Sequence, residues 1–274
     1  MELLKIENLS FAYPKTEKKA LDDISLTLDR GSFSLLCGQS GCGKSTLLRL
    51  IKRELAPYGE KNGRILYCGE PLESLDVRIS AGEIGFVAQN PEEQIVTDKV
   101  WHELAFGLEN LGVAQSDIRR RVGEMASYFG IQDWYHRNTD ALSGGQKQLL
   151  NLAAVMVMQP RLLLLDEPTG QLDPIAAADF IATLQKLNRE LGLTIVLAEH
   201  RLEEVFPIAD QVIAMDRGRI LTAAPPRPAA AALKGHPLSL GLPSACRIWN
   251  GLEAPEPCPL TVKEGRSFLE AGYS

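Results

Sequence analysis

The chain has 274 residues, of which 45% are hydrophobic and 23% are charged, as in an ordinary soluble globular protein. The net charge of −6 and the scattered lysines and arginines leave no basic stripe, which argues against a nucleic-acid partner. No apolar stretch approaches the roughly 18 residues of a membrane span, and no secretory signal pattern opens the chain, so we expect a cytosolic protein.

The N-terminal part is predicted to contain three strands and a helix. Apolar and polar residues alternate over residues 3–8, and residues 25–28 and 33–37 have the same pattern. A glycine-rich stretch at 38–45 follows, and apolar residues at helical spacing then predict a helix from residue 47 toward 55, before Pro57. A strand, a glycine-rich turn and a helix in this order are the context of a phosphate-binding loop.

The middle of the chain is predicted to form a strand and then a helical lobe. Residues 84–88 form a short apolar run, and Pro91 disfavours helix before it, so Gln89 is expected at a strand end or in a loop. Helical patterns over 98–111 and 116–129 indicate a lobe inserted at about residues 92–158. A further helix is predicted over residues 143–158, ending before Pro160.

The C-terminal half predicts more strands alternating with a long helix. Continuous leucines indicate a strand at 161–166 that is buried on both faces, and we predict a helix at 174–191 and strands at 194–198 and 211–215. This alternation predicts an α/β fold whose mostly parallel sheet has helices on its faces. Residues 223–233 have little periodic pattern and are rich in Ala and Pro, which indicates a linker. Short helices without an independent core are expected at residues 243–252 and 259–269.

The loop at residues 38–45 has the glycine, four residues, glycine-lysine-serine spacing of a nucleoside triphosphate cradle. Its residues are Gly38, Gln39, Ser40, Gly41, Cys42, Gly43, Lys44 and Ser45, with Thr46 next. Backbone N–H groups at the start of the helix would bind phosphates, Lys44 would hold the terminal phosphates, and Ser45 would ligate Mg²⁺. A glycine-rich turn without a ligand is the alternative interpretation.

Two acidic residues, Asp166 and Glu167, follow the leucine-rich strand. We expect Asp166 to contribute to the shell of the metal, through water, and Glu167 to polarise the attacking water. Two adjacent acids at a strand end could also simply cap the next helix. The phosphate-binding loop in the same chain favours the catalytic interpretation.

Residues 142–146 read Leu-Ser-Gly-Gly-Gln. Ser143 and Gln146 fit a capping box, and a helix N-terminus with Gly144, Gly145 and a serine hydroxyl is also an anion site. The spacing alone leaves open whether Ser143 contacts the nucleotide of its own chain or that of a partner.

The five cysteines have no metal-ligand spacing and are expected to be reduced thiols. Cys42 lies among backbone N–H donors next to Lys44, an environment that lowers the pKa of a thiol. The simpler interpretation is that any small residue would fit at this position of the loop.

These motifs, in this order, resemble the ATP-binding cassette of ABC transporters over about residues 3–222. The resemblance implies a P-loop NTPase core with a helical subdomain, a domain that ends near residue 222 and a short C-terminal extension at 223–274. It implies ATP and Mg²⁺ as ligands and a second cassette as partner. The two cassettes would face each other head to tail, so that each Ser143–Gln146 signature closes over the ATP of the other.

The resemblance also assigns roles to residues that carry little signal alone. Tyr13 corresponds to the aromatic residue that stacks on adenine, although a lone tyrosine after a strand is as often core or surface. Gln89 corresponds to the glutamine that senses the γ-phosphate and Mg²⁺. Residues 170–173 correspond to the loop that contacts the partner cassette. His200 corresponds to the histidine that contacts the γ-phosphate. His102, His136 and His236 are expected to be structural or at the surface.

Within the superfamily, residues 89–96, 100–107 and 198–201 resemble the ATPases of energy-coupling factor transporters. In these, a homodimer or heterodimer of cassettes drives a transmembrane coupling subunit, which carries small substrate-binding membrane proteins for vitamins or for nickel and cobalt. The resemblance implies a peripheral protein on the cytoplasmic face of the cell membrane. Apolar residues after Gln89 and along the helix at Val100 would form the groove for a coupling helix.

Several alternatives stay open. The segment 223–274 resembles both an extension used for dimer contact and the connector between two fused cassettes, so the chain is a candidate half of such a pair. A conventional ABC importer or exporter is the main alternative. A soluble ABC ATPase acting on nucleic acid or ribosomes would usually insert a coiled coil or basic arm between Lys44 and Ser143, and a small-molecule kinase would lack the 142–146 motif and His200.

Overall fold

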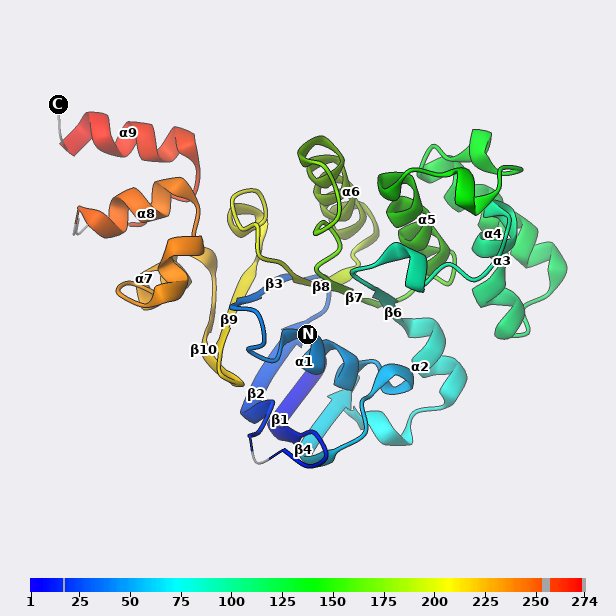
Figure 1. Ribbon diagram of the computed structural model, residues 1–274, viewed down its shortest axis with the longest axis horizontal. Coiled ribbons are helices and arrows are strands. Elements are labelled where there is room, and N and C mark those ends of the chain that lie inside the picture. The colour runs from blue at the N-terminus through cyan, green and yellow to red at the C-terminus, as the bar shows by residue number, and fades with distance from the viewer. Residues whose placement is uncertain (17, 253–256, 273–274) are drawn as a thin grey trace.

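The computed structural model describes residues 1–16, 18–252 and 257–272, whose strands form two sheets (Figure 1). One is antiparallel and has the order β2 (Leu21–Asp29), β1 (Glu2–Ala12), β4 (Glu60–Tyr67) and β5 (Glu70–Pro71). The other has the order β10 (Arg219–Ala224), β9 (Gln211–Asp216), β3 (Phe33–Gly38), β8 (Thr194–Ala198), β7 (Leu162–Asp166) and β6 (Ile84–Val87). Its strands are parallel except for β10, which confirms the mostly parallel sheet.

The parallel sheet is buried on both faces, which explains the continuous leucines of β7. Leu163 packs in a core with α5 (Gly144–Met156) and α6 (Pro174–Leu191). Leu162 points to the opposite face and packs in a second core, with α1 (Lys44–Ile51) and the antiparallel sheet. Because successive strand residues face opposite sides, a strand between two cores must be apolar at every position. One face of the parallel sheet thus carries helices, as predicted, and its other face carries α1 together with the antiparallel sheet.

The helical lobe has a core of its own, formed by α3 (Val100–Asn110), α4 (Gln115–Tyr128) and one side of α5. Leu104 and Leu108 of α3 are buried there, as their helical spacing predicted. α2 (Val77–Glu83) lies against β6. Figure 1 shows this lobe on one side of the sheets and the C-terminal helices on the other.

Local signals set the bounds of α6. The carboxylate of Asp173 accepts hydrogen bonds from the backbone N of Ile175 and of Ala176, both at 3.0 Å, and Pro174 occupies the first turn. Gly192 ends the helix with a φ of 63°, a left-handed conformation that glycine adopts without strain. The predicted bounds of 174–191 are confirmed.

The linker predicted at residues 223–233 is wrong. β10 continues through Ala224, and α7 (Pro226–Ala232) packs against β9 and β10. Ala229 and Ala230 have no exposed surface. Alanine is the best helix former, and its small side chain lets a helix lie close to a sheet, so this composition suits a packed helix as well as a linker. Whether the chain divides near residue 222 remains a prediction.

The two short helices expected in the C-terminal extension are present. They are α8 (Ser244–Gly251) and α9 (Val262–Gly272). Trp249 and Cys246 of α8 join the core that packs on the parallel sheet, so the extension has no independent core, as predicted. Within the described residues, no helix combines the length and the apolar character needed to cross a membrane.

Most predicted elements before α6 correspond to observed ones with small differences at their ends. The helix at 47–55 is α1 followed by a 3-10 turn at Arg53–Leu55, and those at 98–111, 116–129 and 143–158 are α3, α4 and α5. The sequence pattern did not predict β4, β5, α2, β10 or α7. In β4 the first five residues are exposed and mostly polar, so no alternation indicates a strand.

Candidate functional site

The glycine-rich loop at residues 38–45 connects β3 to α1 through positions that have no room for a side chain. A Cβ on Gly43 would lie 2.6 Å from Ala20 O, and the φ of Gly43 is 109°. A Cβ on Gly38 would lie 2.4 Å from Met215 O. The helix α1 begins at Lys44, so its unpaired N–H groups lie at the loop, an arrangement that binds phosphate. The outer part of the loop is exposed and consists of Gln39, Ser40 and Gly41.

Lys44 is only 4% exposed, and oxygen atoms surround its ammonium group. Nζ donates to Gly38 O at 3.0 Å and to Gln39 O at 3.4 Å, and it lies 3.4 Å from Oε1 of Glu167. A buried ammonium group is unfavourable without such partners. The charge of Lys44 is therefore held inside the loop, where the predicted role in phosphate binding requires it.

Ser45 and Asp166 form the predicted metal-binding pair. Ser45 Oγ donates to Asp166 Oδ1 at 2.8 Å, and Asp166 is 5% exposed. Burial raises the pKa of Asp166, the Ser45 hydrogen bond opposes this, and the neighbouring Glu167 raises it further. No group of three or more His, Cys, Asp or Glu side chains in the described residues could hold a metal. The pair fits Mg²⁺, which usually takes one or two carboxylates and completes its shell with water and phosphate oxygens.

Glu167 lies at the centre of the predicted catalytic residues. Its Oε1 is 2.8 Å from Nε2 of His200, and its Oε2 accepts a hydrogen bond from Nε2 of Gln89 at 3.3 Å. The backbone of Glu167 has a φ of 50°, in the left-handed region. Such a conformation costs about 1–3 kcal/mol in a residue with a side chain and persists only where the surrounding structure holds it. The strain is consistent with a functional site.

Gln89 and His200 reach this carboxylate from the ends of two other strands. Gln89 follows β6 in a loop, as predicted, and His200 follows β8. The His200 side chain is 44% exposed, and its Nε2 also lies 3.4 Å from Nζ of Lys44. The structure thus brings together Lys44, Gln89, Glu167 and His200, which the sequence analysis proposed as catalytic.

Tyr13 lies beside the phosphate-binding loop. It follows β1, and its hydroxyl is 3.0 Å from Oγ1 of Thr46 in α1. Its ring packs edge-on against Phe11 with centroids 5.1 Å apart, and 38% of the residue is exposed. An exposed ring next to the loop suits adenine stacking, which remains a prediction.

The signature residues lie at the start of α5, where Leu142 packs in the core of the helical lobe. Ser143 caps α5 and forms the predicted capping box, with Ser143 Oγ accepting from Gln146 N at 3.3 Å and Gln146 Oε1 accepting from Ser143 N at 3.0 Å. Ser143 and Gly144 are exposed, and Gly145 is half-buried. In the described hydrogen bonds these residues bond with each other and not with the phosphate-binding loop. Among the described residues, the signature thus forms no hydrogen bond to Lys44.

A buried glutamine that the sequence analysis missed connects the signature helix to the site. Gln148 has no exposed surface, and its Nε2 donates to Ala88 O and to Pro168 O, both at 3.1 Å. These carbonyls lie directly before Gln89 and directly after Glu167. A single glutamine on a mixed helix face carries no sequence signal for this role, because both partners are distant in the chain.

Cys42 does not have the lowered pKa that its sequence neighbours suggested. The residue is 4% exposed, and burial raises the pKa of its thiol, an effect that the nearby Lys44 only partly opposes. Desolvation disfavours the thiolate more than the adjacent charge favours it. Cys42 is thus a small buried residue of the loop, as the simpler interpretation held.

The three other histidines lie outside the cluster, as expected. His102 pairs with Asp98 on the helical lobe, and His136 is exposed there. His236 Nδ1 accepts a hydrogen bond from Leu238 N in the C-terminal extension.

Comparisons with known proteins identify the family of the chain. The family model described as ABC transporter matches residues 21–170, which is more than half of the chain. The chain is 49% identical over 277 residues to a protein named ABC transporter ATP-binding protein from Bacillus anthracis, with 98% of this chain and 50% of the relative covered. The chain thus spans about half the length of that relative.

Two further similarities extend over nearly the full length of both partners. The energy-coupling factor transporter ATP-binding protein EcfA1 of Symbiobacterium thermophilum is 37% identical over 280 residues, covering 97% of this chain and 94% of that protein. The solved structure of cbiO1 from Clostridium perfringens, described as part of the ABC transporter complex cbiONQ, is 30% identical with a TM-score of 0.75. It covers 88% of this chain and 97% of that chain. The fold is that of a P-loop ABC ATPase, and the chain belongs to the ABC transporter family as an ATP-binding cassette.

Proposed function

We propose that this cassette powers an importer of the energy-coupling factor type whose substrate is a vitamin or a transition-metal ion. The similarity to EcfA1 carries the proposal, because it extends over 97% of this chain and 94% of that protein. The similarity to cbiO1, part of the complex cbiONQ, supports it. The segments at 89–96 and 198–201, which resemble the same subtype, lie at the two strand ends that flank Glu167.

Each residue of the cluster has a proposed part in ATP hydrolysis. Glu167 polarises the attacking water. Contacts with Gln89 and His200 orient its carboxylate. Lys44 neutralises charge on the terminal phosphates, and His200 contacts the γ-phosphate. When bound, Mg²⁺ neutralises phosphate charge, and Ser45, Gln89 and Asp166 would hold it.

The remaining nucleotide contacts come from the loop and from Tyr13. The backbone of residues 38–46 binds the phosphates at the start of α1, with glycines where a Cβ would collide with neighbouring carbonyls. Tyr13 stacks on adenine, for which its exposed ring beside Thr46 is suited.

A second cassette, either another copy or a relative, completes the ATP site. Ser143 is exposed, and its described hydrogen bonds join it to Gln146 and Lys147 of its own helix, whereas Lys44 is buried in the loop that follows β3. We infer that Ser143, Gly144, Gly145 and Gln146 act on the nucleotide of the partner cassette. Closure of two cassettes on ATP and reopening after hydrolysis would then produce the motion that drives transport.

The contact with the membrane partner is proposed on the helical lobe. Val96 is 62% exposed and lines a cavity of about 400 Å³ together with Ile95, Asp98 and Lys147. Phe106 of α3 is 42% exposed. A helix of a transmembrane coupling subunit would place its apolar face on Ile95, Val96 and Phe106, which locates the cassette on the cytoplasmic face of the cell membrane.

Copurification tests the proposed function. The tagged chain is purified from its native membranes in mild detergent, and its partners are identified by mass spectrometry. Recovery of one coupling subunit with small substrate-binding membrane proteins supports the energy-coupling factor type. A conventional permease, or a soluble complex with nucleic acid or ribosomes, contradicts it.

Two valine variants test the docking surface in the same experiment. Val96→Asp places a charge in the proposed groove, and Val77→Asp places one at a similarly exposed valine of α2, where the exposures are 62% and 57%. We expect Val96→Asp to lose the membrane partner and Val77→Asp to keep it. Equal recovery with both variants would contradict the proposed groove.

A further inference from the structure

A buried carboxylate, that of Glu199, lies next in sequence to His200, the proposed γ-phosphate contact. Glu199 lies between β8 and His200 and is 3% exposed. Its Oε1 accepts hydrogen bonds from Thr169 N at 3.2 Å and from Thr169 Oγ1, and its Oε2 accepts from His200 N at 3.0 Å. One side chain therefore binds both the segment after Glu167 and the backbone of His200.

The chemistry of this contact makes it a strong constraint. A carboxylate is unfavourable in a buried position unless hydrogen bonds compensate for lost water, and here three donors do so. Hydrogen bonds to a charged acceptor are shorter and stronger than those between neutral groups. Thr169 is itself 2% exposed, so both side chains of this hydrogen-bonded pair are buried.

The constraint acts on the strained backbone of Glu167. Thr169 follows Glu167 by two residues, and the φ of Glu167 is 50°. The backbone N of Glu167 donates to Ala198 O at 3.0 Å, and Gly170 N donates to Glu167 O at 3.1 Å. The end of β8 thus holds this segment twice, by the carbonyl of Ala198 and by the side chain of Glu199. A left-handed residue with a side chain needs such support.

We propose that Glu199 is a positioning residue for ATP hydrolysis. By binding Thr169 and the backbone of His200 at once, it keeps the Glu167 carboxylate and the His200 imidazole at their separation of 2.8 Å. Its described hydrogen bonds go to Thr169 and His200, and it acts through these two residues. The inference rests on the roles proposed above for Glu167 and His200.

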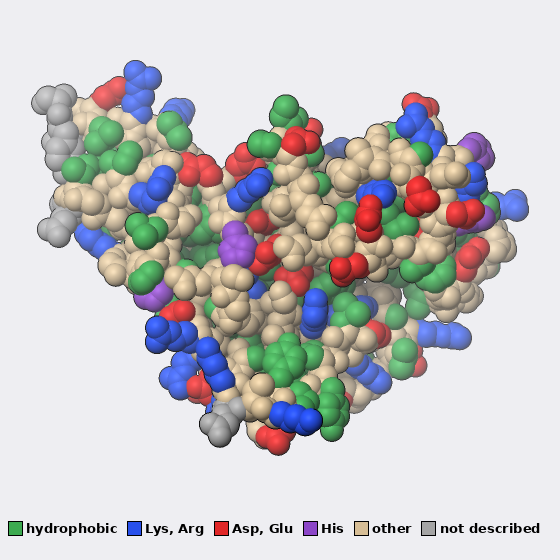
Figure 2. Space-filling model, in the orientation of Figure 1, with side chains coloured by type: hydrophobic (Ala, Val, Ile, Leu, Met, Phe, Trp, Pro, Cys, Tyr) green, Lys and Arg blue, Asp and Glu red, His purple; other side chains and the backbone are tan. Residues whose placement is uncertain are grey.

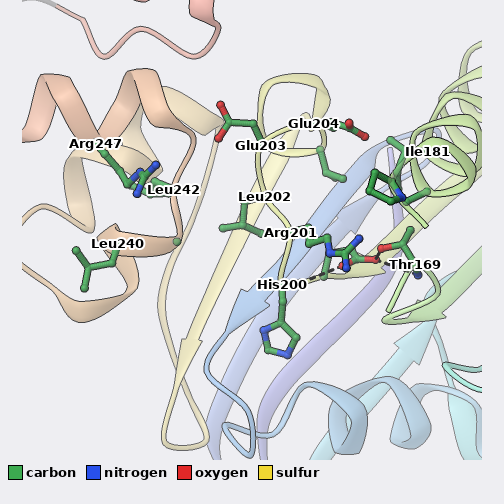
Figure 3. A pocket seen from close by; sticks show the side chains of 15 residues that line it. Thr169, Ile181, His200, Arg201, Leu202, Glu203, Glu204, Leu240, Leu242 and Arg247 are labelled. Carbon is green, nitrogen blue, oxygen red and sulfur yellow. Dashed lines mark hydrogen bonds between the residues drawn. The ribbon is translucent and has the colours of Figure 1, made fainter. Parts of the chain in front are cut away.

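The same loop supplies a matched control. Glu199 and His200 line a cavity of about 410 Å³ between α6 and the C-terminal extension, and Glu204 lines it too (Figure 3). Figure 2 shows the surface hollowed between the C-terminal helices and α6. The Glu204 carboxylate is exposed at this hollow, so its removal leaves the contacts of Glu199 intact.

Steady-state ATP hydrolysis by the full chain, purified with its partners, tests the proposal. We expect Glu199→Ala to lower kcat by about 10- to 100-fold, because small misplacements of reacting groups have effects of this size. The KM for ATP should change less than about threefold, since the lost positioning acts in the transition state. Glu199→Gln, which keeps one acceptor for Thr169, should lose less, and Glu204→Ala should stay within about twofold of the wild type.

The threonine partner gives a second test that does not depend on the folding of the Glu199 variants. Thr169→Val removes the hydroxyl while preserving shape, and Thr169→Ser keeps it. We expect kcat to fall in Thr169→Val and to be retained in Thr169→Ser. Equal kcat in both Thr169 variants would overturn the proposal.

Reference variants separate failure of this inference from failure of the proposed catalytic roles. If Glu167→Gln and His200→Ala keep full activity, those roles are wrong and the proposal falls with them. If these two lose activity while Glu199→Ala stays within about twofold of the wild type, Glu199 alone is misassigned. A Glu199→Ala protein that melts earlier but has an unchanged kcat per folded molecule would make the residue structural and also overturn the proposal.

Discussion

Nε2 of His200 lies 2.8 Å from Oε1 of Glu167, and the two residues follow the adjacent parallel strands β8 and β7. Carboxyl ends of parallel strands meet at one edge of a sheet, which is where ligands bind in open α/β folds. Nζ of Lys44, from the loop after β3, lies 3.4 Å from the same Glu167 oxygen. The position of this carboxylate underlies the first prediction.

We expect Glu167→Gln to lower the turnover of ATP by about 10²- to 10⁴-fold, the range for loss of a general base. ATP binding should persist, because the variant keeps the loop and Lys44. Steady-state hydrolysis and equilibrium binding of ATP are the two measurements. Turnover within about twofold of the wild type would exclude Glu167 from this role.

Asp166→Asn should raise the melting temperature at neutral pH. Burial raises the pKa of Asp166 above its ordinary 3.8, so the folded state holds a proton more tightly than the unfolded chain. The free energy of unfolding therefore falls as pH rises from 3.8 through the folded pKa, and the destabilisation is complete above it. Asparagine removes this charge and keeps an oxygen for Ser45 Oγ.

Differential scanning fluorimetry checks this prediction, with Asp179→Asn on the exposed face of α6 as the control that should leave the melting temperature unchanged. The gain in Asp166→Asn should shrink as the pH is lowered toward 3.8. Stabilisation by Mg²⁺ in the presence of a non-hydrolysable ATP analogue should appear in the wild type and be lost in the variant. A variant that melts earlier than the wild type at pH 7, or that keeps the Mg²⁺ effect, would contradict the account.

The elements with local signals could be predicted from the sequence, and those that depend on distant partners could not. The bounds of α6 and β8 follow from Asp173, Gly192 and the apolar run at 194–198. The polar first half of β4 pairs with β1 far away in the chain, and nothing near it indicates a strand. The alanines of α7 form a buried helix only because β9 and β10 lie beneath them.

A pair of alanine variants tests whether α7 is packed. Ala230→Leu should lower the free energy of unfolding by about 1–3 kcal/mol, the usual cost of overpacking a buried position. Ala231→Leu, one residue on and exposed, should change it by less than about 0.5 kcal/mol. Urea denaturation of both variants measures the difference. Equal stability would mean that residues 223–233 behave as the linker that their composition suggested.

The candidate site, like the fold, contains residues that could be predicted from the sequence and residues that could not. Lys44, Ser45, Asp166 and Glu167 could be predicted because the phosphate-binding loop and a strand end place motif residues at one edge of the sheet. His200 could be predicted only through the resemblance to a known family. Gln148 and Glu199 could not, because their roles arise from contacts with Pro168 and Thr169, which are 20 and 30 residues away. Polar side chains that support a site from behind carry no spacing pattern of their own.

The exposed signature leads to the central claim, that Ser143 acts on the ATP of a second cassette. Ser143→Arg places a bulky cation where the partner's nucleotide would meet α5. Ser127→Arg makes the same change on the exposed surface of α4 and serves as the control.

The measurement that tests this claim most directly compares ATP binding by the isolated monomer with ATP hydrolysis by the assembled cassettes. For Ser143→Arg we predict unchanged monomer binding and a loss of hydrolysis of at least about 100-fold, as for removal of a transition-state donor. Ser127→Arg should match the wild type in both measurements. Loss of monomer binding in parallel with hydrolysis would place Ser143 at the nucleotide of its own chain and contradict the account.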